Sequence, residues 1–295
     1  CDLAGEPLAT VEREIDVEQG PDVVLPLIMD IWSDLLGDRP VSDVWGVGMG
    51  VPATVEFAAG RTESARVMAS WTGIAIPPLI RERFDVPVFV DNDVNVIAMG
   101  EHRKVYADQY DDLLFVKVST RIGAGVIAGG GILRGALGAA GEIGHIPVRD
   151  GGGVLCRCGN TDCVDSVASA TAIVRDLRAR GRDVSSLADA VALVRAGDAE
   201  TMAVIRRAGR LLGEVVASAV NLLNPAVVVL GGDVVEAFQP LVSAVREVVY
   251  SRSTALATRS LRIERSVLGS AAGIAGCALL AIDHVLSAEA VDAPR

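Results

Sequence analysis

The chain has 295 residues, of which 51% are hydrophobic and 22% charged, and its formal net charge is −11. A single hydrophobic core stops growing near roughly 250–300 residues, so this length favours a soluble protein with two lobes. The negative charge repels phosphate backbones and the 4% aromatic content leaves few rings to stack on bases, which argues against direct binding of nucleic acid.

The first ten residues, CDLAGEPLAT, are typical of the middle of a β-hairpin, with Gly5, Glu6 and Pro7 near its turn. The chain begins at Cys1 without a methionine, and we interpret this residue as a truncation point. The first strand of the N-terminal lobe is therefore expected to be truncated.

From residue 45 the chain alternates between strand and helix patterns. The predicted order is a buried strand at 45–51, a short helix at 76–84, a strand at 87–90 and a helix at 94–104. Asn92 or Asp93 is placed to cap the last of these helices. The polar segment 106–112 breaks both periods and predicts a boundary between two lobes.

The second half of the chain continues this alternation. Strands at 112–119 and 122–129 precede a glycine turn at 129–131, helices over 164–223, a strand at 226–232, a helix at 240–250, a strand at 261–265 and a helix from residue 271. The uncharged run 266–282 is shorter than the roughly 18–20 residues of a membrane span, so a buried helix is expected there. Strands and helices in alternation predict an α/β fold with a parallel or mixed sheet.

The most specific pattern lies in residues 141–165, GEIGHIPVRDGGGVLCRCGNTDCVD. Such a loop is compatible with a metal site, with disulfide bonds or with catalysis. Five cysteines are an odd number, and Cys1 and Cys277 lie far from the other three. This distribution argues against a disulfide framework and favours a reducing cytoplasm.

This loop supplies one nitrogen and three sulfur ligands, from His145, Cys156, Cys158 and Cys163. Zinc favours tetrahedral Cys3His sites with this kind of spacing. The alternative is a group of free, buried thiols, but three cysteines so close together in a cysteine-poor chain favour the metal. Since protein side chains would fill all four positions, the zinc is expected to be structural rather than catalytic.

Carboxylates and amides follow the strand at 87–90 and precede the histidine. Asn92 and Asp93 lie where a strand ends and a helix begins, which is where α/β sheets commonly bind ligands. A carboxylate there is suited to act as a general base on a hydroxyl, although helix capping alone would explain the same residues. Glu142, in the motif GEIGH, is either suited to bind sugar hydroxyls or a solvated loop residue.

Together the motifs GEIGH, CRCGNTDC and DNDVN resemble the ROK family of repressors, open reading frames and sugar kinases, and the resemblance covers nearly the whole chain. It implies the actin-like, hexokinase-like duplicated α/β fold (ribonuclease H-like), with two lobes and a sugar cleft between them. It also implies sugar contacts from Asn92, Asp93, Glu142, His145 and Asp165, and zinc bound by His145, Cys156, Cys158 and Cys163. In the kinases of the family, Asp93 would be the general base.

The nucleotide-binding motifs of the family are degenerate in this chain. Their implied positions are Ser119, Thr120, Gly123, Gly231 and Gly232. The family loop usually reads Gly-Thr-Gly-Ile-Gly, whereas this chain has STRIG, with a serine and an arginine in place of two glycines. Arg121 could itself bind phosphate, but its side chain costs the close backbone approach that glycine allows. Asp165 is one methylene shorter than the family's usual glutamate, and Ala53 stands at a common glycine position.

These departures favour the regulators of the family over its kinases. The expected function is the sugar-binding and oligomerisation region of a sugar-responsive transcriptional regulator. The alternative is a hexose kinase that uses ATP and Mg²⁺, with Asp93 as the base. A zinc-stabilised scaffold without a ligand is a third hypothesis, which leaves Asn92, Asp93 and Glu142 unexplained.

The expected division is an N-terminal lobe at 1–108, a C-terminal lobe at 109–287 with a zinc loop at 145–163, and a polar tail at 288–295. The expected partners are a sugar or sugar derivative and further copies of the chain, as a homodimer or homotetramer, with no membrane contact. The resemblance implies DNA binding only through a missing N-terminal domain, and the expected location is the cytoplasm.

Overall fold

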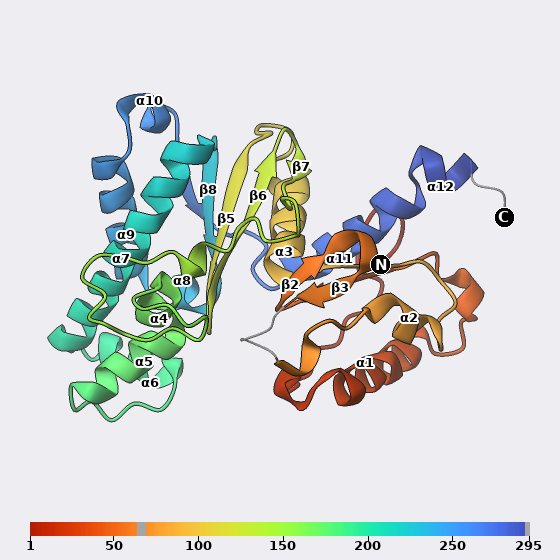
Figure 1. Ribbon diagram of the computed structural model, residues 1–295, viewed down its shortest axis with the longest axis horizontal. Helices are drawn as coiled ribbons and strands as arrows, with labels where there is room; N and C mark the ends of the chain where they lie inside the picture. Colours follow the sequence, from red (N-terminus) through yellow and green to blue (C-terminus); the bar gives the residue numbers. More distant parts are fainter. Residues whose placement is uncertain (64–68, 293–295) are drawn as a thin grey trace. The chain divides into compact units, whose positions relative to one another are not determined.

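The computed structural model describes residues 1–63 and 69–292 (Figure 1). The chain forms two compact units that do not follow chain order. Unit 1 contains Cys1–Val105, Ile132–Ala140 and Ser270–Arg295, and unit 2 contains Tyr106–Gly131 and Gly141–Gly269. The predicted division at residue 108 follows the chain instead, and it differs from the observed one because the helix after Gly269 packs within unit 1.

Unit 1 is built from short strands and several helices. Its strands are β1 (Val47–Val51), β2 (Thr54–Glu56), β3 (Arg61–Glu63) and β4 (Val88–Asn92), and its α-helices are α1 (Pro21–Leu36), α2 (Ile76–Arg81), α3 (Asp93–Glu101), α11 (Ala271–Val285) and α12 (Ala288–Asp292). Single 3-10 turns are η1 (Val17–Gln19), η2 (Val41–Asp43), η3 (Phe57–Ala59) and η4 (Ala69–Trp71). β1 pairs with β4 in parallel, and β2 pairs with β3 in antiparallel orientation.

Helices α3 and α11 approach each other closely in unit 1. A Cβ on Gly100 would lie 2.0 Å from the carbonyl oxygen of Ala272, and one on Gly276 would lie 1.7 Å from that of Val96. Only glycine permits such a backbone contact. The predicted buried helix is thereby confirmed as α11. Among the described residues, none of the helices combines the length and the apolar character that crossing a bilayer requires.

The prediction for the first residues of the chain is wrong. Residues 1–16 contain no strand, because the Asp2 carboxylate accepts hydrogen bonds from the amides of Ala4 and Glu6, both at 2.9 Å, and closes a turn. The predicted hairpin is therefore absent from this segment. Residues Ala288–Asp292, predicted as a polar tail, form the short helix α12, and the last three residues of that tail lie outside the described part of the chain.

Unit 2 contains a mixed sheet with the strand order β7-β6-β5-β8-β9. These strands are β5 (Leu113–Val118), β6 (Ile122–Ala128), β7 (Gly131–Ile132), β8 (Val227–Gly231) and β9 (Arg262–Arg265). The helices are the π-helical turn η5 (His102–Tyr106) that leads in from unit 1, η6 (Ile143–His145), α4 (Val164–Ala168), α5 (Ala170–Ala179), α6 (Leu187–Arg195), α7 (Ala199–Leu223), α8 (Asp233–Ala237), α9 (Gln239–Arg252) and α10 (Ala255–Thr258). Every residue of β8 is buried, which explains its uninterrupted apolar run.

The long helix α7 packs along α9 in unit 2 (Figure 1). Its predicted apolar positions are buried: Val204, Ile205, Ala208, Leu211, Leu212, Val215, Val216, Ala219 and Val220. Gly209 permits close approach, since a Cβ there would lie 2.6 Å from the carbonyl oxygen of Leu241. The helix ends at Asn224, which has φ of 49° in the left-handed region, immediately before Pro225.

Candidate metal centre and sugar site

The loop that carries the candidate metal ligands lies directly on the backbone of β6. Gly141 has φ of +93°, and a Cβ on it would lie 2.0 Å from the carbonyl oxygen of Ala124. A Cβ on Gly144 would lie 2.1 Å from the carbonyl oxygen of Ile122. The Ala124 amide also donates to the Gly141 carbonyl at 2.9 Å. The glycines of GEIGH therefore permit the contact that places His145 beside this sheet.

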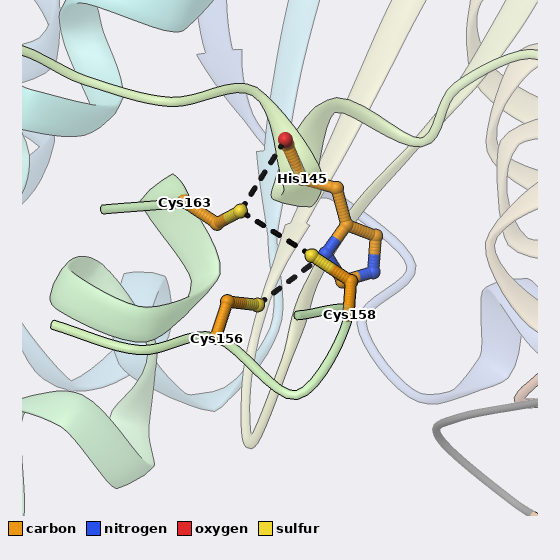
Figure 2. Close-up of side chains that lie close together, drawn as sticks. All are labelled: His145, Cys156, Cys158 and Cys163. Carbon is orange, nitrogen blue, oxygen red and sulfur yellow. Dashed lines mark hydrogen bonds between the residues drawn. The ribbon is translucent and has the colours of Figure 1, made fainter. Parts of the chain in front are cut away.

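Figure 2 shows four side chains of unit 2 whose ligand atoms converge. The Nδ1 of His145 lies 3.6 Å from the Sγ of Cys156, and the Sγ atoms of Cys158 and Cys163 lie 3.6 Å apart. All four ligand atoms lie within 4.8 Å of one another. A tetrahedral zinc with Zn–S bonds of about 2.3 Å and a Zn–N bond of about 2.0 Å has ligand–ligand edges of about 3.5–3.8 Å. The donor set and its spacing therefore fit a zinc ion.

Backbone hydrogen bonds hold the cysteine loop in shape. The Cys156 amide donates to the Asn160 carbonyl at 2.7 Å, and the Gly159 amide donates back to the Cys156 carbonyl at 2.9 Å. The Asp162 carboxylate accepts from the Val154 amide at 2.8 Å. Two of the three thiols, those of Cys156 and Cys163, are buried. These hydrogen bonds shape the loop so that its ligand atoms lie close together.

Burial controls the protons on these thiols. Burial raises the pKa of Cys163 to about 12, and it is also the main cause that raises the pKa of Cys156. At Cys158 burial acts in the same direction, but hydrogen bonds, first that from the Asn160 amide, outweigh it and lower the pKa. The two buried thiols therefore hold their protons at neutral pH, and a zinc ion must displace them to bind.

We predict that zinc binding weakens as the pH falls. The ion competes with protons for three thiolates, so below all three pKa values its apparent affinity should fall by up to about a thousandfold per pH unit. Competition against a chromophoric chelator of known affinity, measured from about pH 8 to about pH 5, checks this expectation. An affinity that stays constant over that range would contradict thiolate coordination.

His145 directs its second ring nitrogen towards Glu142. Its Nδ1 faces the cysteines, whereas its Nε2 lies 3.9 Å from the Glu142 carboxylate. A ring that binds a metal through Nδ1 carries its proton on Nε2, where it can be donated to a carboxylate or to a ligand hydroxyl. The structure therefore brings these two predicted residues together, and the cysteine cluster fixes the orientation of the ring.

Asp165 anchors the turn between β5 and β6. Its Oδ1 accepts a hydrogen bond from the Ile122 amide at 2.7 Å. Burial raises the pKa of Asp165, while this hydrogen bond and the Arg121 guanidinium act in the opposite direction. One carboxylate oxygen of Asp165 is thus hydrogen-bonded to the STRIG turn, and the sugar contact of this residue stays a prediction.

The predicted nucleotide-side positions Ser119 and Thr120 lie in the same turn. The Ser119 hydroxyl donates to the Asp233 carboxylate at 2.9 Å, and the Ser119 amide donates to the Arg121 carbonyl at 3.0 Å. The Thr120 carbonyl accepts from the Thr171 hydroxyl at 3.3 Å. Hydrogen bonds within the protein thus occupy much of this turn.

The predicted glycines of the nucleotide side have different surroundings. Gly232 has φ of +94°, and a Cβ on it would lie 2.5 Å from the carbonyl oxygen of Val118. Gly231 ends β8, and Gly123 pairs with Lys117 within the β5–β6 ladder. The structure therefore brings Gly232 close to the end of β5, next to the turn that contains Ser119.

In unit 1, Asn92 is the residue that caps α3. Its Oδ1 accepts from the Val94 amide at 2.9 Å, and its Nδ2 donates to the Ala53 carbonyl at 3.0 Å. Asp93 is the first residue of α3, and it lines a largely apolar cavity of about 880 Å³ within unit 1. Of the two predicted capping residues Asn92 is confirmed, and the sugar contacts of both residues stay predictions.

Sequence reasoning missed a buried network that begins one residue earlier. Asp91 is 1% exposed, and its Oδ1 accepts from the Asn92 amide at 2.7 Å and from the Asn95 side chain at 2.8 Å. Its Oδ2 accepts from the Nε of Arg134 at 2.7 Å. The motif DNDVN displays Asp91, but no local pattern connects it to an arginine 43 residues downstream.

The chain is similar to known proteins over most of its length. Residues 10–284 match the sequence profile of the ROK family. A glucokinase of Halalkalibacterium halodurans is 32% identical over 92% of this chain and 87% of its own length, and a xylose repressor of Bacillus subtilis is 28% identical over 97% and 73%. The crystal structure of a ROK family transcriptional regulator, a homologue of the E. coli MLC protein, has a TM-score of 0.83 at 26% identity and covers 99% of this chain and 77% of that one. These similarities confirm the predicted actin-like, hexokinase-like α/β fold.

Proposed function

Because the chain belongs to the ROK family, we propose that it is the sugar-binding and oligomerisation region of a sugar-responsive transcriptional regulator. Similarity to both a repressor and a glucokinase supports a sugar-binding domain and leaves regulation and phosphoryl transfer as the candidate activities. The observation that favours regulation is the hydrogen bond between Ser119 and Asp233.

Phosphoryl transfer depends on backbone amides and positive charges placed around the phosphate groups. Here Asp233 follows the Gly231-Gly232 turn, and its carboxylate accepts a hydrogen bond from the Ser119 hydroxyl. Ser119 is only 9% exposed. A triphosphate placed at this turn would meet that carboxylate, and like charges at short range repel each other. The arrangement therefore supports a domain that senses a sugar without phosphorylating it.

In this proposal the sugar hydroxyls are bound by Asn92 and Asp93 of unit 1 and by Glu142, His145 and Asp165 of unit 2. Carboxylates suit this task because they accept several hydrogen bonds from hydroxyls, and the Asn92 amide can both accept and donate. Zinc would be held by His145, Cys156, Cys158 and Cys163, and its contribution would be to fix the His145 ring.

A hexose kinase is the second candidate. The similarity to a glucokinase favours it, as does the position of Asp93 where β4 ends and α3 begins. In a kinase Asp93 would accept the proton of the attacking sugar hydroxyl, with ATP and Mg²⁺ as co-substrate and cofactor.

The regulator hypothesis also concerns partners. We expect a homodimer or homotetramer in the cytoplasm, and DNA contacts made by a domain outside residues 1–295. The net charge of −11 supports this assignment, because the chain itself repels phosphate backbones.

Two measurements on the same protein separate the candidates. Calorimetric titration with neutral hexoses, pentoses and amino sugars is expected to reveal binding of at least one sugar. A coupled assay with ATP and Mg²⁺ is expected to show no sugar-dependent release of ADP. Turnover in the ordinary kinase range of about 1–100 s⁻¹ would overturn the regulator, and no binding of any sugar would overturn both candidates.

For the sugar site we predict that Asp93→Asn weakens binding by roughly 10- to 100-fold, because hydrogen bonds to charged groups contribute about 1.5–3 kcal/mol. The free energy of unfolding should fall by at most about 1 kcal/mol, since Asn92 caps α3 and Asp93 is an acid in its first turn. Asp85→Asn is the matched control, as Asp85 is an exposed acid of the same unit. Equal affinities of wild type and Asp93→Asn would count against this assignment.

A further inference from the structure

One segment links the two units and has no role in the proposed function. Residues 132–140, which we call the strap, belong to unit 1, whereas the residues on either side of them belong to unit 2. The strap leads directly into Gly141 and the GEIGH motif. Contacts that hold the strap in unit 1 therefore also restrain Glu142 and His145, which follow it directly in the chain.

Arg134 is the main side-chain anchor of the strap. Its Nε donates to the Oδ2 of Asp91 at 2.7 Å, and its guanidinium carbon lies 3.7 Å from the centroid of the Phe57 ring. The two charged side chains are 21% and 1% exposed, so this ion pair is well shielded from water. The hydrogen bond from Nε fixes the direction of the Arg134 side chain, and stacking on the ring fixes the plane of its guanidinium group.

The backbone of the strap is also held in unit 1. Gly138 has φ of +77°, and a Cβ on it would lie 1.9 Å from the carbonyl oxygen of Val55 in β2. The Ala140 amide donates to the Arg134 carbonyl at 3.1 Å and closes the strap on itself. The strap is therefore a compact turn, and a shift of Arg134 would move the residues that precede Gly141.

Asp91 connects this anchor to the predicted sugar residues of unit 1. A carboxylate with 1% exposure must be paired and hydrogen-bonded, and Arg134 is the cation that pairs with it. The other oxygen of Asp91 accepts from the Asn92 amide and from Asn95, in the first turn of α3. A change at Arg134 would therefore reorient the carboxylate that holds Asn92.

We propose that Arg134 is a positioning residue that couples the Asn92–Asp93 turn to the Glu142–His145 loop through the Asp91 carboxylate and the strap. A sugar that orders one end would then also restrict the other, which is what a sensor domain needs. The inference rests on the proposed sugar site for its meaning, but the coupling itself can be measured without sugar.

The test is Arg134→Lys, which keeps the charge that Asp91 requires but loses the planar group that bonds and stacks. Amide hydrogen exchange without sugar should be faster by about tenfold at Val94 and Asn95 and also at Ala140 and Ile143, with the amides of α7 unchanged. Sugar affinity should fall by about tenfold while the metal content stays at the wild-type level. A merely structural role would instead accelerate exchange throughout unit 1.

Two further variants keep the test decisive. Asp91→Asn combined with Arg134→Gln replaces the ion pair by two neutral amides, so it avoids an unpaired buried charge if Arg134→Lys folds poorly, and the same faster exchange at Ala140 and Ile143 is expected. Arg103→Lys is the control, because Arg103 forms an exposed ion pair of the same 2.7 Å length with Asp283 in unit 1.

Unchanged exchange at Ile143 in both Arg134 variants would overturn the coupling. If the wild type binds no sugar, the proposed function fails, and the exchange data still decide the role of Arg134.

Discussion

Cys158→Ser is expected to remove the bound metal and to destabilise unit 2. Freshly purified wild type should contain about one zinc per chain, and the variant close to none, because serine does not replace a thiolate ligand. A ligand that binds only the folded state stabilises it by about 4 kcal/mol when its free concentration exceeds Kd a thousandfold. The free energy of unfolding should fall by about this amount.

Cys158 suits this experiment because its side chain is only partly buried, in contrast to Cys156 and Cys163. Serine at this position costs little packing, so the measured loss reports the metal. Elemental analysis gives the metal content, and urea unfolding with and without a chelator gives the stability. A chelator should destabilise the wild type and leave the variant unaffected.

Cys277→Ser is the matched control for this prediction. Cys277 lies in α11 of unit 1, outside the ligand cluster, so its variant should keep both the metal and the sensitivity to chelator. A full complement of zinc in Cys158→Ser would contradict the Cys3His assignment. So would a wild-type protein that is purified without any metal.

The elements and the metal centre could be predicted from sequence because their signals are local. The run AVVVLGG predicts β8 since a buried parallel strand needs apolar residues on both faces. In α7 the apolar period matches the buried face along the whole helix. The ligands from His145 to Cys163 lie within a single loop, so their spacing alone predicts that they converge.

Contacts between residues that are distant in sequence could not be predicted, because local patterns do not indicate which elements pack together. The place of α11 in unit 1 depends on backbone contacts at Gly100 and Gly276, and no periodic pattern indicates which helix meets which. The pairing of Asp91 with Arg134 joins two turns that are distant in sequence. The sequence identifies Asp165 as an acid that follows the last cysteine. The hydrogen bond that it accepts from the Ile122 amide depends instead on how the loop packs on the sheet.

Gly141→Ala is expected to be the most destabilising single-residue change in the GEIGH motif. A residue with a Cβ at φ of +93° is strained by about 1–2 kcal/mol. The added Cβ would also lie 2.0 Å from the Ala124 carbonyl oxygen in β6, so that the loop would have to move off the strand. Overpacking of this kind costs about 1–3 kcal/mol more, which gives a total loss of about 2–5 kcal/mol in the free energy of unfolding.

Gly152→Ala separates the strain from the contact. Gly152 has φ of +95° in the same ligand loop, but a Cβ there would meet no atom within 4 Å. Urea unfolding should therefore show a loss of only about 1–2 kcal/mol for Gly152→Ala, with its zinc retained. In Gly141→Ala the hydrogen bond from the Ala124 amide is lost as well, and the shift of Glu142 and His145 should lower both zinc and sugar affinity. Equal stabilities of the two variants would mean that the loop does not lie on β6, and the positions assigned to Glu142 and His145 would then be wrong.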